Sequence, residues 1–256
     1  MKTHLSYTGR MDTLLYQKVV LSNEITANRF LSSMRLRPSS LSKGVVQSLC
    51  IEGDVLLTTA ADILSLCRST KNLALWIPPS DLAGEHSPLL HSLNALPLTS
   101  LSFSISHVFD HPPLISLSTI PVFSKLSHLE IHNGWVLWSS TVGLEHLQQL
   151  THLCLHVHTR RTKPTLVMSL LRNLQLQVLV FRTSEDLKTV QGFLEHTGLI
   201  DPCIVLVNYA LVDLNDFRSG DITSLWQNAE QIVKQRRATN QGKLKSHNLA
   251  LLLTRG

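Results

Sequence analysis

Short runs in which apolar and polar residues alternate recur along the chain at a near-constant interval. Each run has an apolar–x–apolar centre, and a leucine often stands three residues before it. The anchor leucines of the six clearest runs are 24 to 28 residues apart: Leu49, Leu73, Leu101, Leu129, Leu153 and Leu179. A seventh, less regular run is centred near Val205. Period-two alternation is the pattern of a half-buried strand, so we expect a strand at each position.

The segments between these runs carry apolar residues at helical spacing. Residues 59–69 place Ile63, Leu64 and Cys67 on one face, and residues 87–96 do the same with three leucines. Residues 184–198 begin with Ser184, a suitable N-cap, and end at Gly198. Residues 112–121 are bounded by prolines and should form only one or two turns.

A strand followed by a helix every 24 to 28 residues is the plan of the leucine-rich repeat. One such unit cannot bury its own apolar face, so stacked units share a continuous core. We therefore predict an α/β fold, a leucine-rich-repeat-like solenoid of about six to seven repeats over residues 45–207. Its parallel sheet should line the concave side and its helices the convex side.

The two ends differ from the repeats. Residues 14–44 predict a strand and then a helix capped by Ser22 or Asn23, which would form an N-terminal cap. Residues 208–240 predict a C-terminal capping helix, with Asp221 as N-cap and Trp226 on its apolar face, docked on the last repeat. Residues 1–13 should be frayed, and residues 241–256 form a tail whose packing the sequence leaves open.

The composition and charge of the chain exclude some classes of function. Apolar residues make up 43% and charged residues 16%, which is typical of a chain with a folded core. The net charge is +5, and its main basic cluster has no aromatic residues between its members, so we do not expect nucleic-acid binding. The four cysteines lack C-x-x-C spacing, and no signal peptide or membrane span is visible. These features favour an intracellular protein, cytoplasmic or nuclear. The basic cluster comprises Lys234, Arg236, Arg237, Lys243 and Lys245.

The chemistry-bearing residues concentrate in two neighbouring runs. In a strand, His152, Cys154 and His156 alternate with core residues and should face outward. The preceding repeat places His128, Glu130 and His132 at the equivalent positions. Because parallel strands lie about 4.8 Å apart, the two sets form a ladder on the concave face.

This ladder has two interpretations. Two imidazoles with a cysteine or a glutamate could share a zinc ion, a site drawn from His128, His132, His152, Cys154 and His156. Side chains on a flat sheet diverge, however, and the sequence shows no groups that would orient the rings. We therefore expect solvent-facing polar positions, with no metal and no cofactor.

Enzymatic motifs are missing from the sequence. It has no glycine-rich phosphate loop, no H-E-x-x-H and no G-x-S-x-G. Cys154 would need a base and a lowered pKa to act as a nucleophile. We therefore expect no enzymatic activity and no catalytic residue.

Tryptophans add candidates for a binding surface. Trp76 stands on the outward register of its strand, and Trp135 and Trp138 follow the strand that holds His128. Exposed tryptophans are common anchors of protein interfaces, although packing against neighbouring loops is equally compatible with the pattern. Together with the ladder they predict protein recognition through the concave face and its rim.

Five segments in this order resemble the degenerate leucine-rich-repeat region of fungal, basidiomycete-type F-box-like proteins: LLYQKVVLSNEITANRFL, ILSLCRSTKNLALWIP, LSHLEI, LTHLCL and LWQNAEQIVKQRR. The resemblance spans residues 14 to about 237. It implies repeats that hold a target, and an N-terminal F-box that docks on the adaptor of a cullin ubiquitin ligase. The segment before residue 14 offers no counterpart of that F-box. The expectation is a scaffold that recognises a protein, related to substrate receptors but not expected to bind the adaptor. A histidine-rich metal-binding protein and a truncated fragment without independent function are the alternatives.

Overall fold

The computed structural model describes residues 16–36, 45–77, 88–105, 109, 116–132, 142–208 and 222–240. The chain divides into two compact units. The first comprises Met1–His111 with Ile120–Leu126, and the second comprises Pro112–Thr119 with Ser127–Gly256. The predictions for residues 1–13 and 241–256, and for Asp221 as an N-cap, lie outside the described residues.

The described part of the first unit contains four parallel strands in sequence order. They are β1 (Lys18–Leu21), β2 (Ser48–Glu52), β3 (Asn72–Trp76) and β4 (Ser100–Phe103). The anchor leucines of the sequence pair with one another across β2, β3 and β4, and all are buried: Leu49, Leu73 and Leu101. The predicted alternation therefore builds one row of the core.

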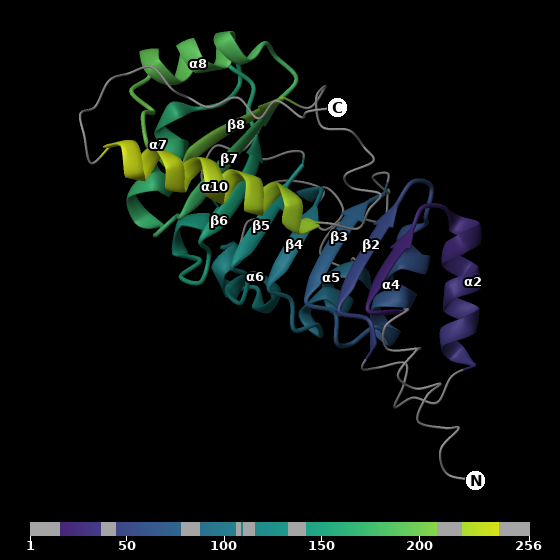
Figure 1. The fold of residues 1–256 in the computed structure, drawn as a ribbon. Helices are drawn as coiled ribbons and strands as arrows, with labels where there is room; N and C mark the ends of the chain where they lie inside the picture. Colours follow the sequence, from purple (N-terminus) through teal and green to yellow (C-terminus); the bar gives the residue numbers. More distant parts are fainter. Residues whose placement is uncertain are drawn as a thin grey trace. The chain divides into compact units, whose positions relative to one another are not determined.

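Helices follow these strands. They are α2 (Glu24–Arg35), α4 (Leu57–Leu66), α5 (Pro88–Asn94) and α6 (Pro121–Ser124). Along the unit, α2 contacts α4, and α4 contacts α5 (Figure 1). The start of α2 is a capping box, in which the Asn23 side chain accepts from the backbone N–H of Thr26 and Thr26 Oγ1 accepts from the N–H of Asn23. Of the two predicted caps, Asn23 is therefore the one used.

The described part of the second unit contains four more parallel strands: β5 (His128–Ile131), β6 (His152–His156), β7 (Val178–Thr183) and β8 (Ile204–Asn208). Their buried row comprises Leu129, Leu153, Leu179 and Ile204. Between the strands lie η4 (Leu144–His146), α7 (Pro164–Asn173) and α8 (Leu187–His196). Before β5 lies the short η2 (Leu117–Thr119), and after β8 comes α10 (Ile222–Asn240).

The helix predicted over residues 184–198 is present as α8, but its cap differs. The side chain of Asp186, not Ser184, accepts the capping hydrogen bond, from the N–H of Thr189 at 3.2 Å. Gly198 ends the segment with φ +72°, as expected of a residue in the left-handed region after a helix.

Helix α10 packs on β8, the strand of the last repeat, and on β7 as well. It lies across the face of the sheet that carries Cys154 (Figure 1). Its Trp226, Ala229 and Val233 pack on outward side chains of three strands: Cys154, Val178, Val180, Val205 and Val207. We call this face, with His128, Glu130, His152, Cys154 and His156, the histidine face. It is the face opposite the leucine row, and α10 covers the part of it formed by Cys154 and the outward valines of β7 and β8.

Part of the predicted basic cluster holds α10 in place. Arg236 donates to the backbone carbonyl of Ile204, and Arg237 donates to that of Gln177 at 3.4 Å. Arg236 is half-buried, so this member of the basic cluster is not fully exposed to solvent. Lys243 and Lys245 lie outside the described residues.

The chain is thus an α/β protein with parallel strands flanked by helices, as predicted. Its classification as a leucine-rich repeat stays a prediction. Among the described residues, no helix combines the length and the apolar run needed to cross a bilayer.

Candidate functional site

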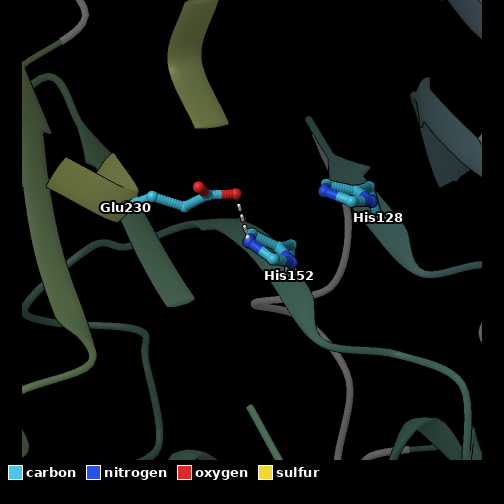
Figure 2. Close-up of side chains that lie close together, drawn as sticks. All are labelled: His128, His152 and Glu230. Atoms are coloured by element: carbon cyan, nitrogen blue, oxygen red, sulfur yellow. Dashed lines mark hydrogen bonds and ion pairs between the residues drawn. The ribbon is translucent and has the colours of Figure 1, made fainter. Parts of the chain in front are cut away.

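The predicted ladder exists in the second unit, and it brings two histidines into contact. His128 of β5 and His152 of β6 occupy paired positions in the parallel register. Their rings stack with centroids 4.1 Å apart and planes 15° from parallel. Figure 2 shows both rings turning the same edge toward Glu230. The strand register therefore places two imidazoles side by side with matching orientation.

Each ring is fixed by the residue that precedes it. Ser127 Oγ lies 2.9 Å from Nδ1 of His128, and Thr151 Oγ1 lies 2.8 Å from Nδ1 of His152. The Thr151 hydroxyl also donates to the carbonyl of Ser127 at 3.2 Å. These contacts are the orienting groups that the sequence did not reveal, and they engage Nδ1 in both rings.

Helix α10 completes the site from above the sheet. Glu230 Oε1 lies 3.2 Å from Nε2 of His152. Trp226, four residues earlier, meets the two rings edge-on, with centroids 5.4 Å from His128 and 5.6 Å from His152. Residues four apart lie on the same side of a helix, so one turn of α10 delivers both side chains.

Burial keeps both imidazoles neutral near pH 7. It lowers the pKa of His128 to about 4, with a further contribution from the neighbouring His152, while Glu230 acts in the opposite direction. It also lowers the pKa of His152, against the opposing effect of the Glu230 carboxylate. Neutral imidazole is the form that binds a metal ion.

A second polar cluster lies on the same face, two residues further along β5 and β6. Glu130 Oε1 accepts from Arg182 Nη1 at 3.0 Å and from the Cys154 thiol at 3.7 Å, and Glu130 Oε2 lies 3.8 Å from His132 Nε2. Burial raises the pKa of Cys154 well above its ordinary value, and the Glu130 carboxylate adds to the effect. The thiol is therefore not poised as a nucleophile.

Several predicted site residues are not where the sequence placed them. The prediction of solvent-facing positions is wrong for Glu130, His152 and Cys154, which are 3%, 4% and 1% exposed. His152 and Cys154 are covered by α10, and Glu130 lies against Arg182 and Cys154. His132 and His156 are half-buried.

The predicted tryptophans separate into two groups. Trp76 is half-buried at the end of β3, and its Nε1 donates to Ser102 Oγ at 2.9 Å. Trp135 and Trp138 lie outside the described residues.

Three residues on the histidine face or packed against it were not predicted as site residues: Arg182, Trp226 and Glu230. Arg182 stands out in a strand that is otherwise apolar or threonine, which is a signal that a buried carboxylate lies nearby. Trp226 was assigned to the core of a helix, and its spacing from Glu230 was visible, but no sequence pattern links either residue to His152.

Among the described residues, one group of three potential metal ligands is found: His128, His152 and Glu230, whose ligand atoms all lie within 4.8 Å of one another. Comparisons of the chain with protein-family models, with curated proteins and with solved structures found no match. The function must therefore be argued from the geometry of this chain.

Proposed function

We propose that the protein is a non-enzymatic scaffold that recognises another protein at one edge of its first unit. This carboxyl edge comprises the ends of β1, β2 and β3 and the starts of α2 and α4. The observation that carries the proposal is the exposure of two large apolar side chains there, Ile25 at 66% and Leu56 at 58%. Apolar side chains that a fold holds in water are candidates for contact with a partner.

A polar network holds this edge in place. Glu24 accepts hydrogen bonds from the backbone N–H of Leu56 at 2.9 Å, from Thr59 Oγ1 at 2.7 Å and from Asn28 Nδ2 at 2.8 Å. In return, Asp54 accepts from the N–H of Glu24 at 3.1 Å. These bonds fix the starts of α2 and α4 next to each other. A surface that is ordered before binding loses less conformational entropy when the partner arrives.

Trp76 supports the same edge. It ends β3, pairs in register with Glu52 at the end of β2, and is half-buried. Tryptophan is a frequent anchor of protein interfaces because it offers a large apolar area and one hydrogen-bond donor. Since neighbouring parallel strands end at the same edge of a sheet, Trp76 belongs with the apolar pair.

The proposal moves recognition away from the histidine face. That face was the predicted binding surface, but α10 covers it in the second unit. The resemblance to the repeat region of F-box-like proteins supports a role in holding a protein target. Docking on a ubiquitin-ligase adaptor is not part of the proposal.

Paired charge insertions test this function. The variants Ile25→Asp and Leu56→Asp place a carboxylate on the carboxyl edge. The matched controls are Leu36→Asp, 88% exposed at the other end of α2, and Ile200→Asp, 70% exposed in the second unit. Each tagged chain is captured from the cells in which it is naturally made, and the co-purifying proteins are quantified by mass spectrometry.

We expect one or more proteins that bind the unmodified chain to be lost from both edge variants and kept by both controls. Melting temperatures must agree among the four variants, so that loss of binding is not loss of fold. Equal recovery with the edge variants and the controls contradicts the proposal.

A further inference from the structure

The contact between His152 Nε2 and the Glu230 carboxylate depends on which ring nitrogen of His152 carries the proton. When the Thr151 hydroxyl donates to Nδ1 of His152, the neutral ring donates from Nε2–H to Glu230. When the hydroxyl instead donates to the carbonyl of Ser127, its Oγ1 accepts from Nδ1, and Nε2 carries a lone pair. That lone pair faces the Glu230 carboxylate oxygen at 3.2 Å. Two acceptors at this distance repel each other unless a cation lies between them.

An added proton on His152 is poorly suited to bridge Nε2 and the Glu230 carboxylate. A second imidazole is stacked on the ring at 4.1 Å, and a positive charge on one ring opposes a charge on the other. A metal ion avoids this conflict because it binds neutral imidazole.

His128 supplies the third ligand. Its Nδ1 contacts Ser127 Oγ as Nδ1 of His152 contacts Thr151, and its ring turns the same edge toward Glu230 (Figure 2). Zinc holds nitrogen and oxygen ligands at about 2.0–2.2 Å, which sets neighbouring ligand atoms roughly 3.4 Å apart in a tetrahedral site. The pair formed by His152 and Glu230 is already at that separation, and the whole group lies within 4.8 Å. Because the two rings stack with planes 15° from parallel, the His128 ring must turn out of the stack to direct its Nε2 lone pair at the same ion.

We propose that Nε2 of His128, Nε2 of His152 and the carboxylate of Glu230 bind one zinc ion, with water as the fourth ligand. The hydroxyls of Ser127 and Thr151 accept from Nδ1 and orient the rings, which is the usual support for histidine ligands. Trp226 closes the apolar side of the site.

The ion ties α10 to the sheet. Two of its ligands come from neighbouring strands, β5 and β6, and the third comes from a helix 78 residues beyond His152. Zinc binding therefore stabilises the position of α10 over the histidine face. This role is independent of recognition at the carboxyl edge of the first unit.

The experiment uses the full chain without a polyhistidine tag, cleared of metal by chelator and then titrated with zinc or cobalt(II). Zinc per chain is measured by elemental analysis after gel filtration, and cobalt coordination by visible absorption. We expect about one zinc per chain and cobalt bands of a tetrahedral site. Zinc should also slow proteolytic cleavage within α10.

Three variants of graded severity locate the ion. Glu230→Gln removes the ligand on the helix and leaves the sheet intact. Thr151→Val removes an orienting hydroxyl and should weaken zinc binding by about 10–100-fold, the effect found for groups that support metal ligands. His152→Ala should abolish binding, but it also opens a buried site, so its folding is checked by circular dichroism.

The matched controls change equivalent residues elsewhere: Glu195→Gln on the surface of α8, and His146→Ala, whose side chain is 65% exposed. Both should bind zinc as the unmodified chain does. Absence of stoichiometric zinc in the unmodified chain overturns the proposal, and so does zinc binding that Glu230→Gln and Thr151→Val leave unchanged. A doubly protonated His152 paired with Glu230 in zinc-treated protein, seen by nitrogen NMR, would also overturn it.

Discussion

Arg182 and Glu130 form an ion pair in which Nη1 lies 3.0 Å from Oε1 and the two side chains are 2% and 3% exposed. Glu130 comes from β5 and Arg182 from β7, so the pair reaches across β6. Buried charges are costly alone, and each partner here compensates for the other. The pair therefore makes the alignment of these strands sensitive to the loss of either charge.

Replacing one partner should destabilise the second unit strongly. Glu130→Gln leaves the Arg182 guanidinium buried without its counter-charge, and we expect a loss of about 3–5 kcal/mol in the free energy of unfolding. Denaturant titration followed by circular dichroism measures the loss. The double variant Glu130→Met with Arg182→Met removes both charges and should be more stable than Glu130→Gln. A double variant that is less stable than Glu130→Gln would contradict this account.

Two glycines with the same backbone angle should respond differently to alanine. Gly53 and Gly198 both have φ +72°, where a side chain costs roughly 1–2 kcal/mol. A Cβ at Gly53 would lie 2.3 Å from the backbone oxygen of Ser22, whereas nothing lies within 4 Å of one at Gly198. Gly198→Ala should therefore cost only the conformational strain, and Gly53→Ala clearly more. Equal losses in the free energy of unfolding would show that the Ser22 contact relaxes without cost.

Trp226 should dominate the attachment of α10. It is 5% exposed and packs on both histidine rings and the apolar side chains of the histidine face. Trp226→Ala should destabilise the protein by about 3–5 kcal/mol, the usual cost of truncating a buried aromatic residue. It should also expose α10 to limited proteolysis. Gln227→Ala, at the next and exposed position of the helix, is the control and should change neither measurement.

The network around Glu24 predicts a pH-dependent contribution to stability. Burial raises the pKa of this carboxyl, but hydrogen bonds from Leu56, Thr59 and Asn28 together outweigh it and lower the pKa below 4.5. The folded state therefore favours the carboxylate. The stabilisation is present above pH 4.5 and is lost as the pH falls through the lowered pKa.

The variant Glu24→Gln isolates this contribution. At pH 7 it should be less stable than the unmodified chain by about 1–2 kcal/mol, toward the low end for hydrogen bonds to a charged group because Glu24 is partly exposed to solvent. The difference should shrink as the pH falls below 4.5 and through the lowered pKa, because Glu24 then becomes protonated in the folded state as well. Parallel denaturation series at several pH values measure it. A difference that does not change between pH 7 and low pH would contradict a role for the charge.

The strands and their register were predictable because the signal is local and repeated. Leu129, Leu153 and Leu179 mark the same position of successive repeats, and each repeat packs mainly on its neighbours. Pairing them predicted that His128 would lie beside His152 and Glu130 beside Cys154, and the observed register confirms both pairs.

The covering of the histidine face was not predicted because it depends on a contact distant in sequence. The apolar spacing of residues 222–240 shows which side of the helix is buried, but not which surface buries it. One signal was available in β7 and β8. Val178, Val180, Val205 and Val207 are apolar on the outward side as well, and strands that are apolar on both sides are covered on both faces. This pattern predicts that another element packs over β7 and β8. In the structure that element is α10, which also extends over His152 and Cys154.

The late position of α10 in the chain has a consequence for protein synthesis. Strands β5 to β8 leave the ribosome one after another, and each can pair at once with the strand before it. Their valine row must wait for Trp226, Ala229 and Val233, which are made after β8 is complete. During that interval a nascent chain presents an uncovered apolar sheet to the cell. Chaperone demand should therefore peak between translation of β8 and translation of α10, and ribosome-bound chains stalled in that window should aggregate most readily.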